Sequence, residues 1–167
     1  MKFFIGSDSS RSHVFDYCVK SISKYNAVFL NGNEENISEL KTIIRKHNSN
    51  IKIFETYYSP INISKIDKTE KYIIFSGIGN PNSFRETLIK NKLNIIKEIK
   101  FPDHYKYKQK DINKIKLFAK NMNAKILTTE KDYIKLNQES SDGIKFLEIE
   151  LIIKNEDDLI NFIKLNI

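Results

Sequence analysis

Apolar residues in this chain form two kinds of pattern that follow one another. Short runs, continuous or alternating, are typical of strands, and apolar residues spaced by three or four are typical of helices with one buried face. The runs predict strands over residues 27–30, 51–57, 72–75, 95–101, 124–127 and 144–152, and the spaced residues predict helices over 13–24, 34–47, 81–91 and 109–122, with further helices beginning at Thr129 and Asn155. This alternation predicts an α/β fold with a largely parallel sheet and right-handed crossovers.

Two of the predicted helices begin with specific signals. Asn80 followed by Pro81 matches the N-cap and the favoured first position of a helix. Thr129, with Asp132 three residues later, is close to a capping box. Lys131 lies in the first turn of that second helix, where a cation opposes the helix dipole. Its position therefore favours a functional or salt-bridging role for Lys131.

Length and composition favour one soluble domain. The 167 residues suffice for a proper core, and we expect a single three-layer domain over residues 1–167, with its sheet flanked by helices. A hydrophobic content of 40% and a charged content of 29% are typical of a globular protein, not of a disordered or membrane-embedded one. The single cysteine, Cys18, fits a reducing compartment. No apolar run approaches the roughly 20 residues that span a bilayer, so we expect a cytoplasmic protein.

The net charge of +7 does not identify a partner. A basic balance is compatible with nucleic acid, a phosphorylated substrate or an anionic membrane surface. The lysines, however, are spread along the whole chain without a basic block, and Lys, Asn and Ile are all favoured by AT-rich codons. We therefore do not expect nucleic acid as a partner.

Candidate chemistry lies at the ends of three predicted strands. The three segments are Phe75–Pro81, Phe101–Tyr105 and Leu127–Asp132, and each begins where an apolar run stops. In α/β folds, functional residues gather at the carboxyl ends of strands. These strand-end segments are therefore the candidate site.

The first segment contains two closely spaced glycines, Gly77 and Gly79, followed by Asn80. Glycine allows a sharp turn and a close approach by a neighbour or a ligand, and a helix N-terminus there is able to hold a phosphate. The spacing matches neither the Gly-x-x-x-x-Gly-Lys-Ser/Thr pattern nor the complete Gly-x-Gly-x-x-Gly pattern. A structural turn and an anion site both remain open.

The other two segments carry charged groups. Asp103 precedes His104, so the acid is placed to orient an imidazole that contacts a phosphate or carries a proton. Adjacent residues often point apart, and a turn histidine is the alternative interpretation. Glu130 and Lys131 occupy the third segment. No spacing of the three histidines indicates a metal site, and we predict no metal ligands.

Taken in order, the strand-end segments resemble the carboxy-terminal half of tetraacyldisaccharide 4'-kinase, the lipid A disaccharide kinase of Gram-negative bacteria. That family has a Gly-Ile-Gly-x-Pro turn preceding a Phe, a Phe-Pro-Asp-His element and a Thr-Thr-Glu-Lys-Asp motif. The matching residues here are Gly77 to Pro81 with Phe84, Phe101 to His104, and Thr128 to Asp132. Residues 27–32 also resemble the family's Asp-Ala-Val-Val-Val-Asn-Gly strand. The resemblance covers about residues 24–167, whereas residues 1–23 match poorly.

The resemblance implies the carboxy-terminal lobe of a P-loop-type kinase. The family uses ATP and Mg²⁺ to phosphorylate the 4'-hydroxyl of a membrane-borne tetraacyldisaccharide 1-phosphate, which yields lipid IV-A. His104 and Asp103 then correspond to the Asp-His element that faces the nucleotide as catalytic candidates. Gly77, Gly79 and Asn80 become candidates on the phosphate side, and Glu130 and Lys131 correspond more weakly.

The family's phosphate loop and catalytic aspartates have no counterpart in this sequence. Without that loop the chain should retain little kinase activity. The resemblance therefore predicts a truncated or split-gene product that works with a separately encoded amino-terminal half, in the cytoplasm or peripherally at the inner membrane. The alternative is a non-catalytic module that binds a phosphorylated ligand, an anionic lipid headgroup or RNA.

Overall fold

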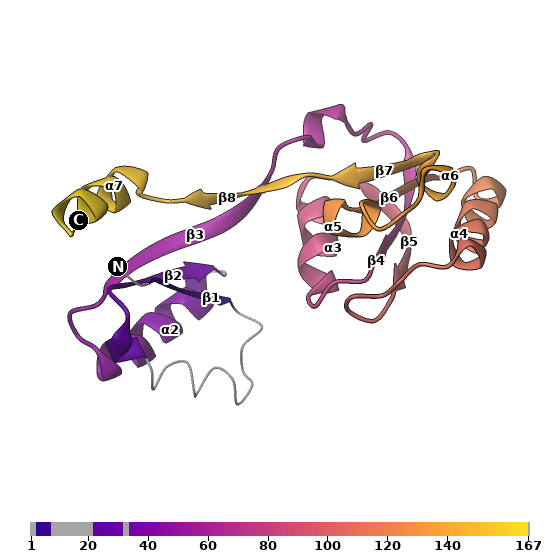
Figure 1. Cartoon of the computed structure of the whole chain (residues 1–167). Coiled ribbons are helices and arrows are strands. Elements are labelled where there is room, and N and C mark those ends of the chain that lie inside the picture. Colours follow the sequence, from indigo (N-terminus) through magenta and orange to yellow (C-terminus); the bar gives the residue numbers. More distant parts are fainter. Residues whose placement is uncertain (1–2, 8–21, 32–33, 167) are drawn as a thin grey trace. The chain divides into compact units, whose positions relative to one another are not determined.

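A computed structural model describes residues 3–7, 22–31 and 34–166 of the chain (Figure 1). The chain divides into two compact units, each of which has its own four-stranded sheet. Unit 1 comprises Met1–Ser59 and Leu151–Ile167, and unit 2 comprises Pro60–Glu150. The chain therefore enters unit 2 from unit 1 and returns to unit 1 at its carboxyl end.

The sheet of unit 1 has the order β1-β2-β3-β8. Its elements are β1 (Phe3–Ser7), η1 (Ile22–Lys24), β2 (Ala27–Asn31), α2 (Glu34–His47), β3 (Lys52–Pro60), β8 (Ile149–Ile153) and α7 (Glu156–Leu165). Strands β1, β2 and β3 are parallel. Val28 and Leu30 of β2 share a core with Ile44 of α2. Phe54 of β3 contacts Phe162 of α7, with ring centroids 5.7 Å apart.

The sheet of unit 2 has the order β5-β4-β6-β7, and all three pairings are parallel. Its elements are η2 (Ile63–Lys65), β4 (Lys71–Ser76), α3 (Pro81–Lys90), β5 (Asn94–Lys100), α4 (Gln109–Asn121), β6 (Lys125–Thr129), α5 (Glu130–Tyr133), α6 (Gln138–Ser141) and β7 (Ile144–Leu147). Parallel neighbours cannot be joined by a tight turn and need a longer crossover connection, which accounts for the helices between successive strands.

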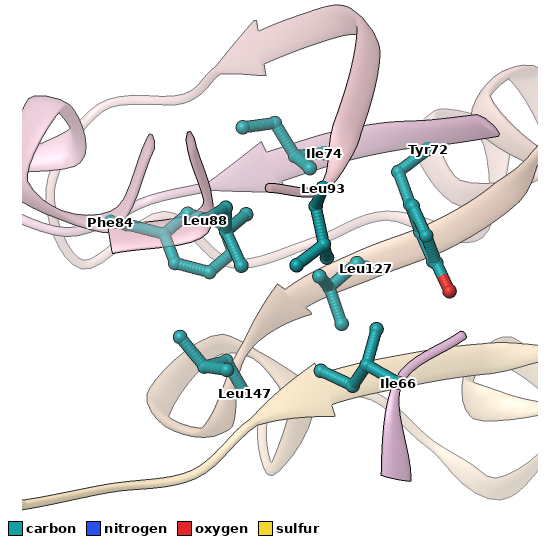
Figure 2. Packing of buried hydrophobic residues seen from close by; sticks show 8 residues of the cluster. All are labelled: Ile66, Tyr72, Ile74, Phe84, Leu88, Leu93, Leu127 and Leu147. Atoms are coloured by element: carbon teal, nitrogen blue, oxygen red, sulfur yellow. The ribbon is translucent and has the colours of Figure 1, made fainter. Parts of the chain in front are cut away.

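Strand β4 lies at the centre of a three-layer arrangement in unit 2. Alternate side chains of a strand point to opposite faces of the sheet. Tyr72 and Ile74 pack with α3 in one core cluster, which Figure 2 shows together with its other members: Ile66, Phe84, Leu88, Leu93, Leu127 and Leu147. Ile73 and Phe75 pack on the other face with Ile112, Ile115 and Ala119 of α4. Because both faces are buried, β4 is a continuous apolar run.

The predicted fold class is confirmed, as are most of the predicted elements. The sheet arrangement differs, because the structure has two four-stranded sheets in two compact units where we expect one sheet in one domain. Hydrophobic periodicity identifies a strand but does not determine which sheet the strand joins. Most of the predicted helix over residues 13–24 lies outside the described residues.

The predicted strand over residues 144–152 shows this limit directly. It forms two strands, β7 in unit 2 and β8, which joins the sheet of unit 1. Glu148 lies between them and its N–H donates to the side chain of Asn62 at 3.0 Å. The amide of Asn62 also donates to the carbonyl of Phe146 at 2.9 Å. Side-chain pairing of this kind replaces sheet pairing at the break.

Candidate functional site

The carboxyl ends of β4, β5 and β6 bring the three predicted segments together in unit 2. These strands are neighbours in the order β5-β4-β6, and all run in the same direction. Five residues from the segments form what we call the strand-end cluster: Gly77, Asp103, His104, Lys131 and Asp132. The three strand-end segments therefore lie at one edge of the sheet of unit 2.

Asp103 is the hub of the exposed part of the cluster. Its Oδ1 accepts a hydrogen bond from the His104 N–H at 2.9 Å and lies 3.8 Å from the Lys131 ammonium. Its Oδ2 lies 3.7 Å from Nε2 of His104. The side chains of His104 and Lys131 are 76% and 50% exposed, so both are accessible to a ligand. The ion pair with Asp103 accounts for the unfavourable place of Lys131 in its helix.

His104 has a left-handed backbone, with φ +57°. This conformation is uncommon for a residue other than glycine and requires support from the surroundings. The support includes a second hydrogen bond, in which the His104 N–H donates to the carbonyl of Gly77 at 3.2 Å. The loop after β5 is therefore fixed to the loop after β4 at the residue that carries the imidazole.

Asp132 forms the buried part of the cluster, and its side chain is fully buried. Its Oδ2 accepts from the Gly77 N–H and from the Thr129 hydroxyl, each at 2.8 Å. Its Oδ1 accepts from the Lys135 ammonium at 2.7 Å. Burial acts to raise the pKa of this carboxyl, but the three donors outweigh it and hold the pKa below its ordinary value.

Gly77 is enclosed so tightly that any larger residue would force its neighbours to shift. A Cβ at this position would lie 2.9 Å from the hydroxyl of Tyr107 and 3.1 Å from the carbonyl oxygen of Pro102. The Gly77 N–H is already taken by Asp132, so it has no capacity left for a phosphate. Gly77 therefore contributes to the site in two ways. Its lack of a side chain allows the close packing, and its backbone groups hydrogen-bond to Asp132 and His104.

The Tyr107 hydroxyl lies against Gly77, 2.9 Å from the place that a Cβ would take there. Burial, followed by the negative charge of Asp132, raises the pKa of the Tyr107 hydroxyl. The Lys135 ammonium lies 5.9 Å from the centre of the Tyr107 ring, within cation–π range. The phenol therefore stays protonated beside the Asp132 carboxylate.

The remaining predicted site residues lie at the same edge with more ordinary contacts. Asn80 caps α3, and its side chain accepts from the Ser83 N–H at 3.2 Å, as the sequence predicts. Gly79 is exposed, and a Cβ there would meet Asp103 Oδ2 at 3.4 Å. Glu130 is the exposed first residue of α5. The structure shows no ion pair between Glu130 and another described residue.

Sequence reasoning underrated Asp132 and missed Lys135 and Tyr107. The cap is real, because the Asp132 N–H donates to Thr129 Oγ1 at 3.1 Å. The carboxylate nevertheless reaches across to Gly77, which a local capping pattern does not reveal. Lys135, three residues after Asp132, was the available signal, since an acid and a base at this spacing share one helix face.

The exposed imidazole and ammonium provide a surface suited to an anionic group. Lys131 supplies a fixed positive charge, and His104 supplies a group that donates a hydrogen bond to a phosphate oxygen. Among residues 3–7, 22–31 and 34–166, no group of three His, Cys, Asp or Glu side chains is placed to hold a metal ion. The described edge therefore presents two exposed hydrogen-bond donors, His104 and Lys131, on either side of the Asp103 carboxylate.

Comparison with known proteins decides the family. The family model for tetraacyldisaccharide-1-P 4'-kinase matches residues 18–167. The chain belongs to this family. A tetraacyldisaccharide 4'-kinase of Pelagibacter ubique (strain HTCC1062) is 44% identical over 149 residues, which are 89% of this chain and 48% of that protein. A kinase of the same name from Rickettsia bellii (strain OSU 85-389) is 49% identical over 92 residues, 55% of this chain and 28% of that protein.

Membership of the tetraacyldisaccharide-1-P 4'-kinase family confirms the resemblance drawn from the strand-end segments. The chain spans about half the length, or less, of these curated relatives. A crystal structure of the Aquifex aeolicus family member in complex with ATP has the same fold, with a TM-score of 0.57 at 18% identity over 97% of this chain and 51% of that one. Within the described part of this family member, no helix has the length and apolar character needed to cross a membrane.

Proposed function

We propose that this chain supplies the carboxy-terminal part of a tetraacyldisaccharide 4'-kinase and that its strand-end cluster forms one wall of the ATP site. The observation that carries the proposal is the meeting of Asp103, His104 and Lys131 at one exposed sheet edge. The family's relatives and an ATP-bound neighbour with the same fold support it.

In the proposed reaction, the 4'-hydroxyl oxygen of tetraacyldisaccharide 1-phosphate attacks the γ-phosphorus of ATP. The bond from that phosphorus to the bridging oxygen breaks, ADP leaves, the hydroxyl proton passes to a base, and lipid IV-A forms. Phosphoryl transfer depends on positioning and on neutralising the charge of the phosphate oxygens. These 167 residues contain no Gly-x-x-x-x-Gly-Lys-Ser/Thr pattern. We propose that the phosphate loop and the base come from an amino-terminal half, either separately encoded or on the same polypeptide.

Within this chain, His104 and Lys131 would contact the phosphates of ATP. Their exposure leaves both polar groups available, and charge-assisted hydrogen bonds to phosphate are the stronger class. Asp103 would orient the imidazole and hold Lys131 beside it. Gly79 and Asn80 would allow the nucleotide to approach the sheet edge, while Gly77 would act through its neighbours and Glu130 would lie at the rim.

Mg²⁺ would accompany ATP, with the phosphates and the amino-terminal half as the source of its ligands. The described residues gather no set of carboxylates for it, and we assign no step to residues of this chain through the metal. The acylated substrate places the assembled enzyme at the cytoplasmic face of the inner membrane.

A chimeric kinase tests the proposal. In the Pelagibacter ubique relative, the segment that matches this chain is replaced by this chain, and transfer of labelled phosphate from ATP to the lipid is measured. The chimera should be active, and the chain alone should be inactive. His104→Ala should lower kcat roughly 100- to 1,000-fold, the effect of removing one preorganised donor aimed at developing charge.

Matched variants control for surface changes. His47→Ala removes an exposed histidine of α2, and Lys114→Ala removes an exposed lysine of α4, and both should leave the rate of the chimera unchanged. Lys131→Ala should raise the KM for ATP. A chimera that folds but transfers no phosphate, or one in which His104→Ala behaves like His47→Ala, would contradict the proposed function.

A further inference from the structure

We infer that Asp132 is a positioning residue for His104, acting through both backbone groups of Gly77. Its effect on catalysis rests on the proposed function, whereas its effect on the loop geometry does not. Among the described residues, Asp132 makes its side-chain hydrogen bonds to Gly77, Thr129 and Lys135 and none to Asp103 or His104, so its influence must pass through the residues between them.

A continuous set of contacts joins the two residues. The Gly77 N–H donates to Asp132 Oδ2 at 2.8 Å, and the Gly77 carbonyl accepts from the His104 N–H at 3.2 Å. The Lys135 ammonium pairs with Asp132 Oδ1 and also lies 3.5 Å from the Gly77 carbonyl oxygen. A shift of Asp132 therefore moves the hydrogen-bond acceptor that supports the left-handed backbone of His104.

Gly77 has no free space in which to absorb such a shift. The carbonyl of Pro102 and the side chains of Tyr105 and Tyr107 surround the place of its missing Cβ at 2.9–3.3 Å. Pro102 and Tyr105 flank Asp103 and His104 in the same loop. Because the packing is this close, a displacement of Gly77 would move the loop that carries His104.

Only a carboxylate satisfies the donors that converge on Asp132. Its two oxygens receive the Gly77 N–H, the Thr129 hydroxyl and the Lys135 ammonium. Asparagine has one oxygen, and its NH₂ group would face another donor whichever way the amide turned. Asp132→Asn is therefore not a neutral change. Removing the opposing ammonium as well, in Asp132→Asn with Lys135→Met, lets the single oxygen face Gly77.

NMR on the whole chain tests the geometry without reference to kinase activity. The chain holds five glycines and three histidines, so selective ¹⁵N labelling of these types gives a small set of amide signals. Asp132→Asn should move the Gly77 and His104 signals and speed exchange of the Gly77 amide about tenfold or more, the worth of a hydrogen bond to a charged group. Asp142→Asn, at an exposed acid of unit 2, is the matched control and should move neither.

If Asp132→Asn alone fails to fold, the double variant still provides a folded chain in which the role of Asp132 is measured. Asp132→Asn with Lys135→Met should fold, and its Gly77 exchange should be faster than in the unchanged chain. If the Gly77 and His104 signals of a folded Asp132 variant coincide with those of the unchanged chain, the inference is overturned.

The chimeric kinase then separates positioning from a merely structural role. Asp132→Asn should lower kcat about tenfold when His104 is present and should have little further effect beside His104→Ala, because two residues acting on one contact are not additive. An undiminished effect of Asp132→Asn in the His104→Ala background would overturn the inference and leave the proposed function standing. An inactive chimera would count against the proposed function, and the NMR result would still decide the inference.

Discussion

Asp132 and Gly77, 55 residues apart in the chain, are joined by a hydrogen bond of 2.8 Å from the backbone N–H of Gly77 to a fully buried carboxylate. The bond connects the residue after β4 with the helix after β6. It stands beside a second link at the same edge, where the Thr128 hydroxyl donates to the Phe75 carbonyl at 2.7 Å. The Thr128 hydroxyl thus reinforces the last register pair of the two strands, Phe75 with Thr128, and the Asp132 carboxylate extends the connection beyond it to Gly77.

Asp132→Ala should destabilise unit 2 by about 2–3 kcal/mol. The change leaves the Gly77 N–H without its acceptor and the Lys135 ammonium without its partner. Unsatisfied buried polar and charged groups lower the free energy of unfolding. The figure lies below that for a wholly buried pair because the Lys135 side chain is 24% exposed and is able to regain water. Urea unfolding measures the effect. Asp142→Ala, at an exposed site, should change the free energy of unfolding by less than about 0.5 kcal/mol.

Because the pKa of Asp132 is lowered, part of the stability of the fold should be lost in acid, and substitution of Asp132 should reduce this loss. A carboxyl whose pKa is lower in the folded state than the ordinary value of about 3.9 stabilises the fold above that value. This contribution is lost as the pH falls through the lower folded pKa. In Asp132→Asn the free energy of unfolding should therefore depend less steeply on pH below about pH 4. Unfolding by urea across a series of acidic buffers measures the slope, and equal slopes in the two chains would contradict the assignment.

The fold could be predicted from the sequence as far as local patterns determine it. The continuous apolar run of residues 72–75 predicts the buried strand β4. The capping residues Asn80 and Thr129 predict where α3 and α5 begin. The division into two sheets could not be predicted in this way. It depends on which strands β7 and β8 pair with. The apolar pattern over residues 144–152 would be the same whether these residues joined one sheet or two.

For the candidate site too, local sequence identifies individual residues but not the contacts between residues far apart in the chain. Asp103, His104 and Lys131 could be singled out because each follows a strand and parallel strands end at a common edge. The ion pair of Lys131 was foreseen as one of two roles, because its charge opposes the dipole of its own helix. The connection of Asp132 to Gly77 could not be foreseen, since its cap already explained the residue. Tyr107 was overlooked because nothing in its local sequence indicates that its hydroxyl lies against a glycine.

Three glycine-to-alanine substitutions should rank by what the new methyl group meets. Gly77→Ala should cost about 1–3 kcal/mol, because the Cβ would press on the buried Tyr107 hydroxyl and on the backbone of Pro102. Gly143→Ala should cost about 1 kcal/mol through its positive φ alone, since nothing lies within 4 Å. Gly79→Ala makes ordinary contact and should cost less than about 0.5 kcal/mol. Thermal or urea unfolding gives the order, and a Gly77→Ala chain as stable as Gly79→Ala would contradict the enclosed geometry.

The same series separates stability from function. Gly79 is exposed beside Asp103, so a methyl group there occupies space that the proposed nucleotide would need. In the chimeric kinase, Gly79→Ala should raise the KM for ATP while the free energy of unfolding stays nearly unchanged. Gly143→Ala should show the opposite pattern, with a small loss of stability and an unchanged KM. An unchanged KM in Gly79→Ala would remove Gly79 from the nucleotide side.

The two units should respond separately to loss of core side chains. Ile44 belongs to a core cluster whose members all lie in unit 1, and Leu88 belongs to one whose members all lie in unit 2. Truncation of either residue to alanine should cost about 2–5 kcal/mol. Because the clusters share no residue, Ile44→Ala should speed amide exchange in α2 and β2 and leave β4 and β6 unchanged, with the reverse for Leu88→Ala. Hydrogen exchange followed by mass spectrometry resolves these segments. Equal acceleration of both units by either substitution would instead show one cooperative domain, which is what the length of the chain alone suggests.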